Sequence, residues 1–160
     1  MTEWQLTGGY VLGPSRRLGR PRPVAGVRRP LRSERCTRRR SVLVVEDEPA
    51  IRALLVEFLC GEGYQVEVAR DGHEALQLLY ERGPLQRPGV VLLDMMLPTM
   101  DGLDVLQDLK AHGVGVPVVA MSASHEALIK ALAAGARAIL PKPFDLDRLL
   151  WTLERQGATA

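Results

Sequence analysis

The sequence contains few of the residues that build disulfide scaffolds, zinc sites or membrane spans. Only two cysteines, Cys36 and Cys60, occur in 160 residues, and their spacing matches neither a disulfide framework nor a metal site. The three histidines are equally scattered, which argues against a histidine-based metal site. No run of about 18 apolar residues exists, and the N-terminus lacks the basic-then-apolar order of a signal peptide. We therefore expect a protein of a reducing cytoplasm, without membrane insertion.

Charge is divided unevenly along the chain. Residues 1–40 contain 11 arginines, no lysine and two acidic residues, a net charge of +9, whereas residues 41–160 hold 10 basic and 17 acidic side chains, a net charge of −7. Four prolines and the mutual repulsion of the arginines predict that residues 1–40 form a disordered Arg/Pro-rich basic tail. Such a tail could contact nucleic acid or an acidic partner. It could equally be a solvated tail, or an upstream stretch that is not part of the native protein.

From Ser41 onwards, apolar runs alternate with helical periodicity. Strands are predicted at residues 42–45, 65–69, 90–94, 117–121 and 137–140. Each is followed by a helix; the fourth helix is predicted over residues 125–134, closed by Gly135. This order predicts a doubly wound α/β domain over residues 41–157, with a five-stranded parallel sheet, five helices and a short C-terminal tail at 158–160.

Four of the five predicted strands end in polar groups of distinct kinds. The first ends in Glu46 and Asp47, the third in Asp94, the fourth in Ser122 and the fifth in Lys142. In a parallel sheet these ends share one edge. If the strand order is 2-1-3-4-5, the first and third strands are neighbours at the switch point, and Asp47 faces Asp94.

This set of side chains favours phosphoryl chemistry. Two ionised carboxylates about 4 Å apart repel by roughly 4 kcal/mol at an effective dielectric constant near 20. A hard divalent cation such as Mg²⁺ removes that repulsion through oxygen ligands. A free oxygen of Asp94 can then act as a nucleophile toward phosphorus. The ammonium of Lys142 and the hydroxyl of Ser122 are suited to stabilise the phosphoryl oxygens.

Four segments, VLVVEDEP, LLDMMLPTMDG, VVAMSAS and LPKPF, together resemble the receiver domain of bacterial two-component response regulators, a flavodoxin-like fold. The resemblance covers about residues 41–157. It implies that Asp94 is the phosphoacceptor, that Asp47 binds Mg²⁺ directly and Glu46 through water, and that the Met96 backbone carbonyl is a further ligand. It also implies that Ser122 and Lys142 bind the phosphoryl group, and that the Lys142–Pro143 bond is cis.

Three departures from the receiver pattern affect signal output more than phosphorylation. Glu46 replaces the commoner aspartate at the start of the acidic pair. Ile139 stands where many receivers carry a switching Tyr or Phe, so no ring can rotate toward Ser122. The segment from Ser122 to Gly135 is about two residues shorter than in many relatives, which predicts a shorter or shifted fourth helix.

The resemblance implies a stand-alone receiver, similar to the single-domain chemotaxis regulators. A sensor histidine kinase or a histidine phosphotransfer protein is expected to phosphorylate Asp94 with Mg²⁺, and the signal to pass to an unknown downstream protein by contact. Beyond its own phosphorylation and dephosphorylation, the domain is not expected to be an enzyme. Two alternatives stay open: a phosphorylation-independent interaction module, and a nucleic-acid-binding regulator acting through residues 1–40.

Overall fold

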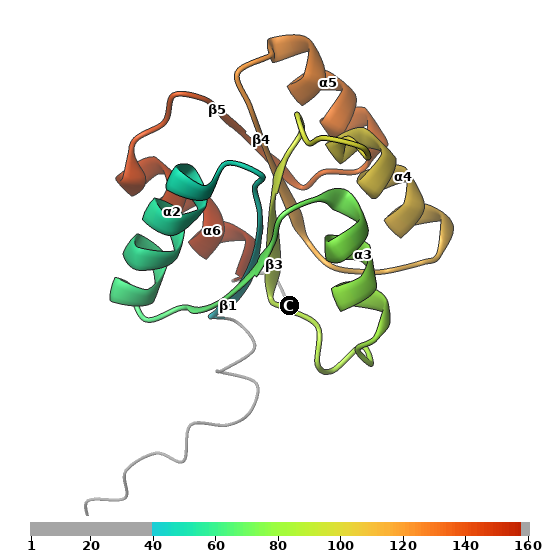
Figure 1. The fold of residues 1–160 in the computed structure, drawn as a ribbon, viewed down its shortest axis with the longest axis horizontal. Helices are drawn as coiled ribbons and strands as arrows, with labels where there is room; N and C mark the ends of the chain where they lie inside the picture. Colours follow the sequence, from blue (N-terminus) through green and yellow to red (C-terminus); the bar gives the residue numbers. More distant parts are fainter. Residues whose placement is uncertain (1–39, 158–160) are drawn as a thin grey trace, which may run out of the picture. The chain divides into compact units, whose positions relative to one another are not determined.

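Within residues 40–157, which the computed structural model describes, five strands and five helices alternate along the chain (Figure 1). The strands are β1 (Ser41–Val45), β2 (Gln65–Ala69), β3 (Val90–Asp94), β4 (Val118–Ser122) and β5 (Ala138–Pro141). The helices are α2 (Pro49–Gly61), α3 (Gly72–Tyr80), α4 (Gly102–Ala111), α5 (His125–Ala134) and α6 (Leu146–Gly157). The predicted alternation is confirmed.

The strands form one parallel sheet in the order β2-β1-β3-β4-β5, which confirms the predicted doubly wound topology. The central strands β3 and β4 are buried along their whole length, whereas the edge strand β2 is partly exposed. In the ladder, Val45 of β1 pairs with Leu93 of β3, and Asp94 pairs with Met121 of β4. Because the register is nearly level, the carboxyl ends of β1, β3 and β4 meet at one edge of the sheet.

Helices cover both faces of the sheet, as right-handed crossovers require. Helices α2 and α6 lie on one face, and α3, α4 and α5 lie on the other (Figure 1). Side chains of β1 alternate between the two cores: Val42 and Val44 pack with α2 and α6, whereas Leu43 and Val45 pack in the core under α3, α4 and α5. Continuous apolar strands are what a sheet buried on both faces needs.

Short polar side chains cap the N-termini of four helices. The side chains of Asp71, Asp101, Ser124 and Asp145 each accept a hydrogen bond from the backbone N–H three residues ahead. Helix α5 spans His125–Ala134 and ends at Gly135, which has a φ of 112°, as predicted. Strand β1 begins one residue earlier than predicted, and strands β4 and β5 each lie one residue later than predicted.

Two predictions lie outside the described residues. The disorder of residues 1–40 concerns positions 1–39, which are not described, and the short C-terminal tail at 158–160 is likewise outside the structure. Across residues 40–157, no helix combines the length and the apolar character that crossing a bilayer requires.

Candidate functional site at the carboxyl ends of the strands

Three carboxylates gather at the end of the sheet where β1 and β3 finish. Glu46 and Asp47 follow β1 directly, and Asp94 is the last residue of β3. One carboxylate oxygen from each of the three residues lies within 4.8 Å of the other two. Glu46 and Asp94 are buried, whereas Asp47 is exposed at the rim. The topology therefore brings together the acidic residues that the sequence placed at separate strand ends.

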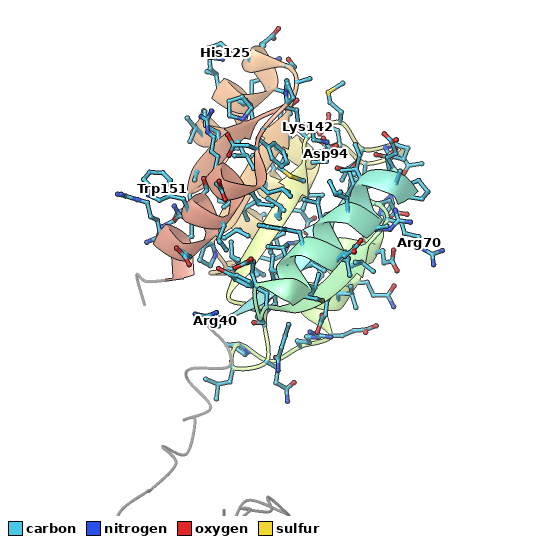
Figure 2. The ribbon with its side chains drawn as sticks, turned by 90° about the vertical axis from the view of Figure 1, so that its left-hand side faces the viewer. Arg40, Arg70, Asp94, His125, Lys142 and Trp151 are labelled. Atoms are coloured by element: carbon cyan, nitrogen blue, oxygen red, sulfur yellow. The ribbon has the colours of Figure 1, made fainter. Side chains whose placement is uncertain are left out.

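Lys142, from the segment after β5, reaches into this acidic cluster. Its Nζ donates a hydrogen bond of 2.6 Å to Oδ2 of Asp94 and one of 2.9 Å to Oε2 of Glu46. Figure 2 shows Asp94 and Lys142 next to each other at one end of the strands. The Glu46 side chain is 1% exposed and that of Lys142 is 19% exposed, so these ion pairs are largely withdrawn from solvent.

Backbone N–H groups hold the remaining oxygens of the two buried carboxylates. The N–H of Met96 donates to Oδ1 of Asp94 at 2.8 Å, and the N–H of Glu48 donates to Oε1 of Glu46 at 3.3 Å. Met95 extends the ladder beyond β3 by donating its N–H to the carbonyl of Met121 at 2.9 Å. Asp94 is thus fixed by a strand, a backbone N–H and an ammonium group.

Ser122 ends β4, beside the end of β3, and is 1% exposed. Its Oγ accepts a hydrogen bond from the N–H of Ser124 at 3.1 Å, and its carbonyl accepts one from the N–H of Lys142 at 2.8 Å. The Lys142–Pro143 peptide bond is cis, as expected from the resemblance. The structure therefore connects Ser122 to Lys142 through the backbone, while the Ser122 hydroxyl is bonded within its own loop.

Burial and charge shift the pKa of two groups in this cluster. Burial, together with the nearby charge of Asp94, raises the pKa of Glu46 even though Lys142 acts in the opposite direction. Burial would lower the pKa of Lys142, but its hydrogen bonds and ion pairs with Asp94 and Glu46 outweigh burial and raise it. The lysine stays charged at neutral pH, and one ammonium does not fully offset the cost of ionising Glu46.

The loop between β3 and α4 is shaped by a strained turn and a close backbone approach. Thr99 has a φ of 65°, and the N–H of Met100 donates to the carbonyl of Pro98 at 2.7 Å, which closes a γ-turn around Thr99. At Gly102, an added Cβ would lie 2.7 Å from the carbonyl oxygen of Asp94. Helix α4 therefore begins directly against the backbone of Asp94.

The donor set suits a hard divalent cation. Three carboxylates and one ammonium have a net charge of −2, and their free lone pairs are oxygen donors of the kind that Mg²⁺ prefers. Glu46, Asp47 and Asp94 are the side chains that could hold such an ion. Met96 contacts Asp94 through its N–H, and the contribution of its backbone carbonyl to a cation site stays a prediction.

Sequence reasoning missed one side chain next to this site. Nη1 of Arg52, on α2, donates hydrogen bonds to the main-chain carbonyls of Glu46 at 2.8 Å and Asp47 at 3.0 Å. The sequence did contain a signal, because Arg52 lies five residues after Asp47. An arginine at that position also fits the solvated face of a helix. Ile139, the predicted departure, is partly buried and packs in the core under α3, α4 and α5.

An open α/β sheet of this strand order, with an acidic cluster at its switch point, defines the flavodoxin-like fold class. Residues 42–154 match the family of the response regulator receiver domain, and the chain belongs to this family. Response regulator MprA of Mycolicibacterium vanbaalenii is 42% identical over 111 residues, which cover 68% of this chain and 46% of the relative. The chain thus spans about half the length of the curated relatives it matches.

Solved receiver domains share the same fold. The receiver domain of NtrX from Brucella abortus superposes with a TM-score of 0.67 at 34% identity, covering 74% of this chain and 99% of that one. The receiver domain of sensor histidine kinase PA1611 from Pseudomonas aeruginosa has a TM-score of 0.66 at 29% identity, covering 75% and 98%. That structure carries a magnesium ion coordinated in its active site cleft.

Proposed function

We propose that this domain accepts a phosphoryl group on Asp94 in a Mg²⁺-dependent phosphorelay. The observation that carries the proposal is the contact of 2.6 Å between Nζ of Lys142 and Oδ2 of Asp94, within a cluster of three carboxylates. A structural ion pair alone does not need two further acidic residues beside it. A phosphoacceptor does, because a cation must offset the charge that the phosphoryl group brings.

In the proposed transfer, an oxygen of Asp94 attacks the phosphorus of a phosphohistidine. A new P–O bond forms, the P–N bond breaks, and its electron pair stays on the imidazole nitrogen, which takes up a proton. Lys142 supplies positive charge beside the phosphoryl oxygens. The Ser122 hydroxyl, whose oxygen accepts from the N–H of Ser124, can donate its own hydrogen to one of them. Hydrolysis by water then restores the Asp94 carboxylate.

The cation would be held by Glu46, Asp47, Asp94 and the backbone carbonyl of Met96. When bound, Mg²⁺ neutralises the carboxylates and the incoming phosphoryl charge. The donor protein is a sensor histidine kinase or a histidine phosphotransfer protein, and the domain would meet it in the cytoplasm. Beyond self-phosphorylation and autodephosphorylation, we assign no enzymatic activity to the domain.

A small-molecule phosphodonor tests this function without knowledge of the kinase. Incubation with acetyl phosphate and Mg²⁺ should add the mass of one phosphoryl group to the protein, and the gain should disappear in Asp94→Asn and after chelation of the cation. The matched control is Asp104→Asn, which lies on the first turn of α4 and is not one of the three clustered carboxylates. Absence of the mass gain, or its survival in Asp94→Asn, would refute the proposal.

Ile139 gives a specific reason to keep the phosphorylation-independent interaction module as a second candidate. An aliphatic side chain at this partly buried position of β5 has no ring or hydroxyl to respond to Ser122. In that case Asp94→Asn would leave partner binding unchanged, whereas a phosphorelay receiver would lose the phosphorylation-dependent part of it. The nucleic-acid alternative rests on residues 1–40, of which the structure describes Arg40 alone.

A further inference from the structure

Arg52 binds the backbone of the acidic pair rather than any of its carboxylates. Its Nη1 donates to the carbonyl oxygens of Glu46 and Asp47, at 2.8 Å and 3.0 Å, from the first part of α2. Both residues lie between β1 and α2, outside regular secondary structure. The N–H of Glu46 still donates to the carbonyl of Ala69 of β2 at 3.2 Å, which extends the ladder by one residue. The carbonyls of Glu46 and Asp47 are held by the side chain of Arg52.

The carboxylates of Glu46, Asp47 and Asp94 differ in the hydrogen bonds that hold them. Glu46 and Asp94 each accept hydrogen bonds from Lys142 and from a backbone N–H. Among the described residues, the Asp47 side chain has no hydrogen bond or ion pair, and Asp47 is exposed. The direction of its carboxylate therefore depends on the orientation of its own backbone. That backbone is bonded to Arg52.

We infer that Arg52 is a positioning residue for cation binding: it holds the backbone of Glu46 and Asp47 so that the Asp47 carboxylate faces Glu46 and Asp94 before the cation arrives. This inference rests on the proposed Mg²⁺-dependent function. Ligands that are already oriented lose less conformational freedom on binding, so affinity rises without any new contact to the ion. Groups that orient metal ligands in this way typically change metal affinity by about 10- to 100-fold when removed.

Electrostatics alone predicts the opposite effect, which makes the inference testable. The guanidinium is a permanent positive charge at the edge of a cation site, and like charges repel. If charge were all that mattered, removal of Arg52 would tighten Mg²⁺ binding. If Arg52 positions Asp47, its removal weakens Mg²⁺ binding. A purely structural link between β1 and α2 would lower stability and leave the Mg²⁺ affinity of the folded protein unchanged.

The experiment is an isothermal titration of the full chain with MgCl₂, in the absence of any phosphodonor. The variants are Arg52→Met, Arg52→Lys and the matched control Arg148→Met, whose exposed side chain lies on α6. We expect the Kd for Mg²⁺ to rise about tenfold in Arg52→Met. The single ammonium of Arg52→Lys should give an intermediate affinity, and Arg148→Met should match the wild type. At saturating Mg²⁺, phosphorylation of Arg52→Met by acetyl phosphate should return close to the wild-type rate.

An unchanged or lower Kd in folded Arg52→Met, with circular dichroism like that of the wild type, overturns the inference alone. If Arg52→Met does not fold, Arg52→Lys decides: an affinity below that of the wild type supports positioning, and an equal affinity overturns it. If the wild type itself binds no Mg²⁺, the proposed function fails and this inference fails with it. The wild-type titration therefore separates the two failures.

Discussion

Replacing Gly102 by alanine tests how closely helix α4 approaches the end of strand β3. The new Cβ would lie 2.7 Å from the carbonyl oxygen of Asp94, 2.7 Å from Cα of Met95 and 2.8 Å from Sδ of Met95. Ordinary contacts between carbon atoms are about 3.5–4.0 Å, so the methyl group is about 1 Å too close. Two of the three atoms belong to the backbone, which cannot move away by changing a rotamer.

The cost follows from that geometry. Overpacking a well-packed site costs about 1–3 kcal/mol, and a clash with two atoms of the Asp94–Met95 peptide unit places Gly102→Ala near 3 kcal/mol. For a domain of this size, that corresponds to a fall of about 10 °C in the melting temperature. The relaxation must also shift the peptide after Asp94, so phosphorylation by acetyl phosphate should slow as well.

Gly61 provides a matched control for the same chemical change. It is the last residue of α2, and an added Cβ there would meet nothing within 4 Å. Gly61→Ala should stabilise the domain by about 0.5–1 kcal/mol through helix propensity. Urea unfolding followed by circular dichroism measures both variants. A Gly102→Ala variant as stable as the wild type would show that α4 does not begin against the backbone of Asp94.

Three further predictions concern strain and charge. Thr99→Gly should raise the free energy of unfolding by about 0.5–1 kcal/mol, because glycine adopts the φ of 65° without the steric cost; a lower urea midpoint would contradict the strained turn. Lys142→Met leaves two buried carboxylates unpaired and should cost about 3–5 kcal/mol at neutral pH. The pKa of Lys142 is raised in the folded state, so its contribution to the free energy of unfolding is complete below pH 10.5 and fades as the pH rises through the folded-state pKa. The stability difference between Lys142→Met and the wild type should therefore shrink in strong alkali. Burial and the hydrogen bond to Asp108 raise the pKa of Tyr80 to about 12, so the stability from this group is lost as the pH rises from 10 to about 12. A Tyr80→Phe variant identifies which step of the phenolate absorbance titration belongs to Tyr80. Asp108→Asn should move that step to lower pH, and an unmoved step would exclude Asp108 as a cause of the raised pKa.

Much of the architecture was predictable because it depends on short-range patterns. Apolar runs followed by polar residues predicted four of the strands, and alternation of polar and apolar residues predicted the second. Right-handed crossovers left few topologies to consider. The fourth helix was predicted within the observed bounds because Gly135 is a strong C-terminal cap residue. The error of one residue at the start of β5 lies where Arg137 still donates its N–H to the carbonyl of Val118, so the ladder ends gradually there.

The residues of the candidate site could be predicted from the sequence, whereas their proximity could not. Its acidic residues, its lysine and its serine could be named from the sequence because each one ends a strand or follows it directly, and parallel strands end at a common edge. Their proximity was conditional on the strand order, which the sheet then established. Their chemical roles stay predictions until phosphorylation and Mg²⁺ binding are measured.

Local order along the chain was sufficient to determine the secondary structure, the fold class and the residue types available for chemistry. Tertiary structure alone decided that Lys142 pairs with Glu46 and Asp94, that Arg52 holds the backbone of the acidic pair, and that Gly102 begins α4 against Asp94. The physical reason is one of range. Periodicity and capping act over a few residues, whereas hydrogen bonds and steric contacts between distant segments depend on how the strands and helices pack.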